Sequence, residues 1–125
     1  MSKKPKNIQE YLAYDYVSAC ASNDMSSYEI EAAVMEQHIT DLLIVDVREL
    51  FEEPRLNKLI SNAYLEIPLS KLEKDMARCK DQDLVFVCQS GKRSKKAVEM
   101  MLQKGHTKKI FSLRNGIQGL SKFLQ

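Results

Sequence analysis

The stretch Leu84-Val85-Phe86-Val87-Cys88-Gln89-Ser90-Gly91-Lys92-Arg93-Ser94 carries the strongest structural signal in this chain of 125 residues. Residues 84–88 are apolar on both faces, which is typical of a strand buried in a parallel sheet with helices on either side. Residues 89–93 are predicted to form a loop, and Ser94 is predicted to open a helix that Gly105 stops. A buried strand, a short loop and a helix in direct succession indicate an α/β fold.

The chain on both sides of this stretch follows the same pattern. Two further apolar runs, 42–47 and 109–113, are predicted strands, and 67–69 is a short extended segment. Residues 114–116 are a predicted turn. Because strands alternate with helices along the chain, the strands are expected to pair in parallel. The predicted architecture is therefore α/β, with a small, mostly parallel central sheet flanked by helices on both faces.

The first predicted helix spans about residues 27–38. Ser26 and Glu29 fit a capping box, in which each side chain bonds to a free backbone N–H of the first turn. Ile30 and Val34 would then lie on the inner face of this helix.

Two shorter helices are predicted further along the chain. Ser70 is expected to cap a helix whose apolar side is formed by Leu72, Met76 and Cys79. Residues 117–123 form a last short helix. Residues 50–60 receive no assignment, because Pro54 interrupts any helix there.

Length and composition limit the classes of protein to which this chain can belong. Hydrophobic residues make up 44% and charged residues 29% of the chain, which fits one globular domain. The formal charge of +2 is too balanced for a nucleic-acid binder. No apolar run approaches the roughly 18 residues of a membrane span, and the basic N-terminus leads into no apolar stretch. We expect a cytoplasmic protein, with residues 1–24 as an N-terminal extension or linker and residues 25–125 as the domain.

The three cysteines, Cys20, Cys79 and Cys88, are too few and too scattered for a zinc site or a disulfide framework. No metal and no cofactor are therefore expected. Cys79 falls on the apolar side of its helix and is expected in the core, whereas Cys20 lies in the N-terminal extension without a motif. Cys88 differs from both, because it ends a strand and precedes a basic loop with a glycine.

The loop after Cys88 favours a thiolate. Backbone N–H groups of a short loop can converge on the sulfur, the helix N-terminus adds a partial positive charge, and Gly91 lets the loop curl with a positive φ. Four cations follow: Lys92, Arg93, Lys95 and Lys96. Each of these features stabilises a thiolate over a thiol. The alternative is a small buried cysteine that ends a strand, but such a residue needs no basic loop.

Two chemistries use a cysteine in an anion-binding loop before a helix. Phosphate-ester hydrolysis normally needs a loop one residue longer, with arginine at the position where this chain has Ser94. Here Arg93 comes one residue earlier, and Val87 precedes the cysteine where a phosphatase has histidine. The shorter loop fits a smaller load, which is a single sulfur atom carried on Cys88 as a persulfide.

At this point the sequence resembles the rhodanese (sulfurtransferase) family over about residues 25–124. Residues 43–49 look like the family's strand and Asp-x-Arg signature, and residues 63–69 are similar to its Ala-x-Asn-Ile-Pro-Leu segment. Residues 88–94 match the Cys-x-x-Gly-x-Arg-Ser active loop. Residues 113–117 resemble the final Leu-x-Gly-Gly turn, with asparagine in place of the first glycine. The family's Gly-His-Ile-Pro-Gly segment is absent, and residues 56–62 stand in its place.

The resemblance implies roles for individual residues. Cys88 would be the nucleophile that becomes a persulfide, and the cradle around it would be formed by Gln89, Ser90, Gly91, Lys92, Arg93 and Ser94. Arg93 would also contact an anionic donor, and Lys92 either meets the donor or is a solvated charge. Asp46 and Arg48 would shape or line the site at the neighbouring strand end, or else form a local ion pair that fixes that end. Lys95 and Lys96 would be a solvated helix face that attracts acidic partners.

The function implied by the resemblance is sulfur transfer through the Cys88 persulfide, from thiosulfate or from a small-molecule or protein persulfide to a thiophilic acceptor. Small domains with this loop often resemble the C-terminal halves of the adenylyltransferases that activate sulfur-carrier proteins for molybdopterin or thiamine synthesis. An acidic sulfur-carrier protein would then be the partner. No nucleic acid or membrane is expected as a partner. The alternative from another class is a rhodanese fold used as a docking or regulatory module without catalysis.

Overall fold

The computed structural model describes residues 28–121 and contains a five-stranded sheet in which each neighbouring pair is parallel. The strands are β1 (Glu29–Ile30), β2 (Leu43–Asp46), β3 (Tyr64–Glu66), β4 (Leu84–Val87) and β5 (Ile110–Leu113). Their order across the sheet is β1-β5-β4-β2-β3. The strand with the strongest sequence signal, β4, is therefore the central one, and the predicted α/β class is confirmed.

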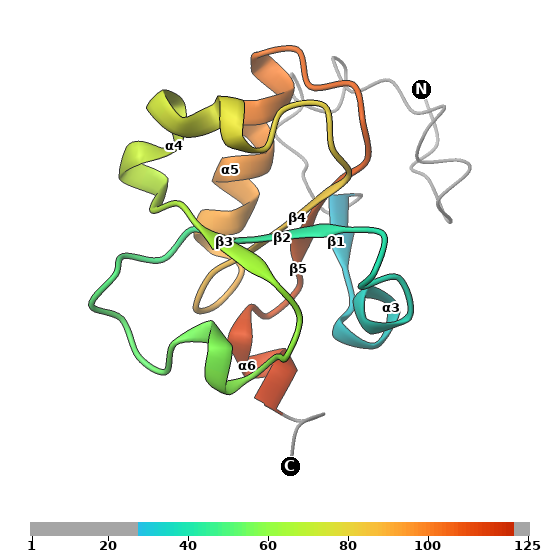
Figure 1. The fold of residues 1–125 in the computed structure, drawn as a ribbon, viewed down its shortest axis with the longest axis vertical. Coiled ribbons are helices and arrows are strands. Elements are labelled where there is room, and N and C mark those ends of the chain that lie inside the picture. The colour runs from blue at the N-terminus through green and yellow to red at the C-terminus, as the bar shows by residue number, and fades with distance from the viewer. Residues whose placement is uncertain (1–27, 122–125) are drawn as a thin grey trace.

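Helices cover both faces of this sheet, as predicted. They are α3 (Ala32–Gln37), α4 (Leu69–Asp75), α5 (Lys92–Gln103) and α6 (Ile117–Ser121), with two short 3-10 turns, η2 (Leu56–Lys58) and η3 (Met76–Arg78). In Figure 1, α4 and α5 lie on one side of the sheet and α3 and α6 on the other. Helix α5 packs against both β4 and β5, which brings its N-terminus to the end of the central strand.

The core is formed where these layers meet. All four residues of β4 and all four of β5 are buried, which explains why β4 is apolar on both faces and why β5 has a single polar residue, Ser112. The Cys79 side chain is fully buried between helix and sheet, as its position on an apolar stripe predicted. Burial of these apolar groups supplies most of the driving force for folding.

The parallel register brings the carboxyl ends of the central strands to one edge of the sheet. Asp46 at the end of β2 lies opposite Val87 at the end of β4, and Phe86 lies opposite Ser112 of β5. The backbone N–H of Val47 continues the ladder by donating to the carbonyl of Val87 at 2.9 Å. The residues that follow β2 and β4 therefore share one edge, which is where chemistry collects in open parallel sheets.

The first predicted helix is wrong in its first half. Residues 29–30 form the edge strand β1, which pairs with the end of β5, and the helix begins at Ala32. Its N-cap, Glu31, makes no side-chain capping bond. Val34, expected on the inner face, is 38% exposed, whereas Ala32 and Met35 are buried. Pairing with β5 competes successfully with helix formation here, because it satisfies backbone groups and buries Ile30.

Two boundaries in the middle of the chain also differ from the prediction. The extended segment lies at Tyr64–Glu66 rather than at 67–69, and α4 follows after Pro68. Ser70 lies inside the first turn of α4 and caps nothing; its hydroxyl donates to the Glu49 carboxylate at 3.1 Å. A proline before the first turn replaces the expected cap, because its fixed φ suits the entry to a helix.

Helix α5 begins two residues earlier than predicted, at Lys92, so that the loop after Cys88 is only three residues long. Its C-terminus agrees with the prediction. Gly105 has a φ of +89°, and its N–H donates to the Leu102 carbonyl at 3.0 Å. This left-handed glycine ends the helix in the usual way.

Residues 28–121 contain no helix that is both long and apolar enough to cross a membrane. The predicted extension, residues 1–24, lies outside the described residues.

Candidate active site

The Cys88 sulfur lies inside a cradle of backbone N–H groups. Cys88 is the first residue after β4, and its Sγ accepts hydrogen bonds from the N–H of Gly91 at 3.0 Å and from the N–H of Ser94 at 3.3 Å. The residue is buried, with 1% of its surface exposed. Two N–H donors aimed at one sulfur stabilise negative charge on it, because hydrogen bonds to an ionised acceptor are the stronger kind.

The start of α5 supplies this geometry. The N–H of Ser94 belongs to the first turn, where helix N–H groups have no partner within the helix. Gly91 precedes the helix with a φ of +99°, as predicted for a curled loop. A Cβ on Gly91 would lie 3.3 Å from the Asn115 nitrogen and 3.4 Å from the Leu113 carbonyl oxygen. The glycine therefore provides both the backbone angle and the close approach to the following turn.

Two buried hydroxyls lie beneath the sulfur. The Cys88 thiol donates to Ser94 Oγ at 3.5 Å, and Ser94 Oγ donates to the Gly91 carbonyl at 3.1 Å. Ser112 Oγ of β5 lies 2.6 Å from Ser94 Oγ. The sequence analysis missed Ser112, although a signal was present: it is the one polar residue of a strand whose four members are all buried.

The turn after β5 supports the loop from behind. A Cβ on Gly116 would lie 2.3 Å from the Cys88 carbonyl oxygen, so no side chain fits there. The N–H of Ile117 donates to that same carbonyl at 3.0 Å. Asn115, which occupies the place of the family's first glycine, has a φ of +63°. Asparagine tolerates this left-handed conformation better than most residues, so the departure leaves the turn intact.

Arg93, the predicted anion contact, is already paired with a carboxylate. Its Nη1 donates to Glu52 Oε2 at 2.6 Å and its Nη2 to Glu52 Oε1 at 2.7 Å. The hydrogen bonds from Arg93 hold the pKa of Glu52 at about 2, well below its ordinary 4.5. The same bonds raise the pKa of Arg93. Sequence reasoning missed Glu52, because its segment carried no recognisable pattern.

The segment that carries Glu52 is fixed by further contacts. Glu52 Oε2 also accepts from the backbone N–H of Glu49 at 2.7 Å. Arg55 Nη1 donates to the carbonyls of Glu49 and Glu52, at 2.9 and 2.8 Å. The other end of the Arg55 guanidinium pairs with Glu66 and lies 3.7 Å from Asp46. One arginine therefore ties the segment 49–52 to the ends of β2 and β3.

Asp46 and Arg48 form a fully buried ion pair at the end of β2. Arg48 donates from Nε to Asp46 Oδ1 at 3.1 Å and from Nη2 to Oδ2 at 3.0 Å, and its backbone N–H donates to Oδ1 at 3.0 Å. Neither side chain is exposed. The geometry is that of a pair that fixes the strand end next to Cys88. Arg48 Nη1 has no hydrogen-bond partner among the described residues.

Comparison with known proteins places this geometry in a family. The model of the rhodanese-like domain matches residues 28–122. The chain belongs to the rhodanese-like domain family. A sulfurtransferase of Allochromatium vinosum is 32% identical over 93 residues, which cover 71% of this chain and 83% of that protein.

Solved structures agree with this assignment. A rhodanese-related protein of Thermoplasma volcanium is 28% identical with a TM-score of 0.61, over 76% of this chain and 91% of that one. A thiosulfate sulfurtransferase of Pseudomonas aeruginosa, at 16% identity and a TM-score of 0.62, covers 91% of this chain and 22% of its own. The latter likeness shows the fold alone.

The remaining polar residues of the rhodanese-like loop differ in how far they are exposed to solvent. Gln89 is half-buried, and Ser90 and Lys92 are exposed. Among residues 28–121, no carboxylate lies within ion-pair distance of Lys92. Lys92 is therefore the cation of this loop that stays available to an approaching anion.

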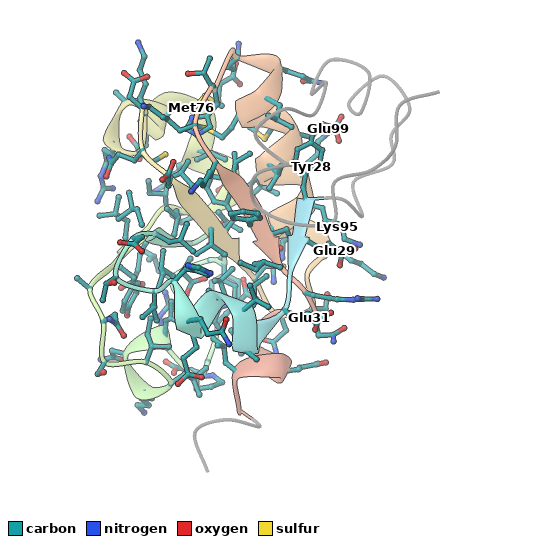
Figure 2. The ribbon with its side chains drawn as sticks, turned by 90° about the vertical axis from the view of Figure 1, so that its right-hand side faces the viewer. Tyr28, Glu29, Glu31, Met76, Lys95 and Glu99 are labelled. Atoms are coloured by element: carbon teal, nitrogen blue, oxygen red, sulfur yellow. The ribbon has the colours of Figure 1, made fainter. Side chains whose placement is uncertain are left out.

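The next two lysines lie beside carboxylates outside the loop. Lys95 lies beside Glu29 of β1, with 3.6 Å between Nζ and Oε1, and Figure 2 shows the two side chains next to each other. Lys96 is 60% exposed and lies 3.9 Å from Glu99, one turn further along α5. Both positions agree with the solvated helix face expected for them.

Cys79 offers a contrast within the same rhodanese-like domain. Burial raises the pKa of its thiol, and its Sγ donates to the Met76 carbonyl at 3.4 Å. A buried thiol of this kind is a poor nucleophile. Within residues 28–121, no cluster of histidine, cysteine or acidic side chains has the arrangement of a metal site.

Proposed function

We propose that this protein transfers sulfane sulfur by carrying it as a persulfide on Cys88. Membership of the rhodanese-like family and a sulfurtransferase relative support a sulfurtransferase role. The observation that carries the finer proposal is the cradle itself, in which two backbone N–H groups meet the Cys88 sulfur at 3.0 and 3.3 Å. A group of donors around one sulfur atom is what an anionic nucleophile and its persulfide need.

The proposed reaction has two sulfur-transfer steps. The Cys88 thiolate attacks the outer sulfur of the donor, the bond from that sulfur to the rest of the donor breaks, and the leaving group departs with the electron pair. The leaving group is sulfite when the donor is thiosulfate, and a thiolate when the donor is a persulfide. An acceptor nucleophile then attacks the outer sulfur on Cys88 and regenerates the thiolate. No external oxidant or reductant is consumed.

The other loop residues have supporting roles in this proposal. The loop Gln89 to Ser94 holds the sulfur through its backbone, Lys92 meets the incoming donor, and Arg93 lies at the mouth of the cradle. Asp46 and Arg48 act indirectly: their ion pair fixes the end of β2 beside Cys88.

We further propose that the acceptor is an acidic sulfur-carrier protein, of the kind that serves molybdopterin or thiamine synthesis. The exposed Lys92 in the loop after Cys88 and the exposed Lys96 further along α5 support this choice, since surface cations steer acidic partners. We place the reaction in the cytoplasm, where thiols stay reduced.

Intact-mass spectrometry tests the proposal. Wild-type protein and the variants Cys88→Ser and Cys79→Ser are incubated with thiosulfate and, separately, with a cysteine-desulfurase persulfide. Wild type and Cys79→Ser should gain the mass of one sulfur atom, which reductant removes, and Cys88→Ser should gain none. Sulfur loading of a correctly folded Cys88→Ser variant would contradict the proposal. Failure of wild type to load from either donor would favour a docking module instead.

A further inference from the structure

We propose that Glu52 is a specificity-determining residue that occupies Arg93 and thereby discriminates against small anionic sulfur donors. On this view the preferred donor is a persulfide, whose outer sulfur carries at most one negative charge, rather than a dianion such as thiosulfate. The inference rests on the proposed function, because it names the class of donor for the same site.

The contact geometry carries the first step. Arg93 offers two parallel N–H groups, which is the arrangement that binds a carboxylate or a tetrahedral anion in the bidentate manner. Glu52 fills both positions, at 2.6 and 2.7 Å. A donor anion that needed Arg93 would therefore have to displace a carboxylate of the same chain.

The second step is that Glu52 is held in place. Its own carboxylate accepts from the Glu49 N–H, and its carbonyl accepts from Arg55. The surface pair of Arg114 and Glu31 lacks such support, and both of its side chains are 57% exposed. The Glu52 side chain is only 20% exposed. A supported, part-buried pair is harder to open than an exposed one.

The third step concerns charge near the sulfur. The pairing with Arg93 keeps Glu52 ionised at every pH above the acid range. Its negative charge offsets the positive charge of Arg93 in the loop that follows Cys88, so that an incoming anion meets a weaker attraction there. Lys92 remains as the available cation and is enough to steer a singly charged or protein-bound donor.

Alkylation of Cys88 tests the inference without using sulfur transfer. Iodoacetate and iodoacetamide differ mainly in charge, so the ratio of their rate constants at Cys88 measures how well the site admits an anion. Glu52→Gln should raise the iodoacetate-to-iodoacetamide ratio about five- to ten-fold, a change that corresponds to opening one supported ion pair. Glu53→Gln is the matched control, because it removes the same charge from an exposed neighbour that does not touch Arg93. Its ratio should change less than about two-fold.

Kinetics with two sulfur donors supply the second readout. Glu52→Gln should lower the KM for thiosulfate about five-fold or more. It should change the KM for a small persulfide that carries no other charged group much less, because that donor has at most one negative charge. If Glu52→Gln fails to fold, Glu52→Ala serves instead, because it removes both the charge and the two contacts with Arg93, and the same rise in the ratio is expected. An unchanged alkylation ratio in a folded variant would overturn the inference. A raised alkylation ratio in Glu52→Gln, together with failure of wild type to load sulfur on Cys88, would overturn only the proposed function.

Discussion

Ser112 of β5 shows how one buried hydroxyl can support the surroundings of the Cys88 sulfur, which follows another strand, β4. Its Oγ lies 2.6 Å from Ser94 Oγ, which in turn lies 3.5 Å from the Cys88 sulfur. All three side chains are fully or almost fully buried. The hydroxyl of Ser94 is therefore oriented by a strand that follows it in the chain. Ser112 also donates to the Gly91 carbonyl at 3.5 Å, so it supports the loop around the sulfur at two points.

Replacing Ser112 by alanine removes one partner of this buried pair. We expect Ser112→Ala to lower the free energy of unfolding by about 1–2 kcal/mol, since a buried hydroxyl loses its hydrogen bond. Sulfur loading of Cys88 should slow but persist. Urea denaturation and timed mass spectrometry measure the two effects, with the exposed Ser90→Ala as control. Unchanged stability of Ser112→Ala would show that the pair contributes nothing.

Gly116 and Gly105 allow two constraints on a glycine to be compared: a positive φ and the lack of space for a side chain. Both have positive φ, at +59° and +89°. A Cβ on Gly105 would meet nothing within 4 Å, whereas one on Gly116 would lie 2.3 Å from the Cys88 carbonyl oxygen. Gly105→Ala should cost about 1–2 kcal/mol of stability from backbone strain alone. Gly116→Ala should cost more than that, at least about 3 kcal/mol, and should displace the active loop.

Thermal unfolding of the two alanine variants, followed by sulfur loading of those that fold, measures the difference. Gly105→Ala should load normally, because its helix end lies far along α5 from Cys88. Equal losses of stability in the two variants would contradict a steric role for Gly116.

At the level of elements, the position of the loop after Cys88 depends on the contacts that fix the end of the neighbouring strand β2. Asp46 and Arg48 form a buried pair at the end of β2, and Arg55 links the following segment to the same place. Arg93 of α5 is joined to this segment through Glu52. The active loop is thus tied to its neighbouring strand by ion pairs as well as by the backbone ladder.

Breaking the buried pair should be costly. Asp46→Asn leaves the Arg48 guanidinium buried without a counter-charge, and we expect a loss of about 3–5 kcal/mol in unfolding free energy. The exposed pair of Glu31 and Arg114 provides the control, since Glu31→Gln should change stability by less than about 1 kcal/mol. Chemical denaturation at neutral pH measures both. A loss below 1 kcal/mol for Asp46→Asn would mean that the pair is easily replaced by other contacts.

The sequence predicted those elements whose signal is local. The central strands β2, β4 and β5 and the glycine stop of α5 follow from apolar runs and one turn residue. The edge strand β1 could not be found, because two residues are too few to show a period and their strand pairing depends on β5, more than 80 positions later. The same limit applies to the site. Cys88 and Gly91 lie in one motif, whereas Glu52 and Ser112 reach it only through tertiary contacts.

At the scale of the whole molecule, the pairing of Glu52 with Arg93 makes stability depend on pH in the acid range. The pKa of Glu52 is about 2 in the folded protein against an ordinary 4.5. A lowered pKa means that the ionised form favours folding, so its contribution is complete above pH 4.5 and is lost as pH falls towards 2.

Comparison of wild type with Glu52→Gln measures this contribution. Near pH 7 we expect wild type to be more stable by about 1–2 kcal/mol, and the difference should shrink as the pH falls from 4.5 towards 2. Urea denaturation at pH 7, 4 and 2.5 would follow the change. A difference that stayed constant over this range would show that the stabilisation does not come from the charge of Glu52.

The position of β5 in the sheet also has a consequence for the time at which the site forms. This strand comes last in the chain, yet it lies between β1 and β4. During synthesis, Cys88 leaves the ribosome before Ser112 and Ile117, which bond to Ser94 and to the Cys88 carbonyl. In a nascent chain, Cys88 therefore lacks the hydrogen bonds that involve Ser112 and Ile117 until almost all of the described residues have been synthesised. The complete surroundings of the sulfur form only after this late strand has paired with β4.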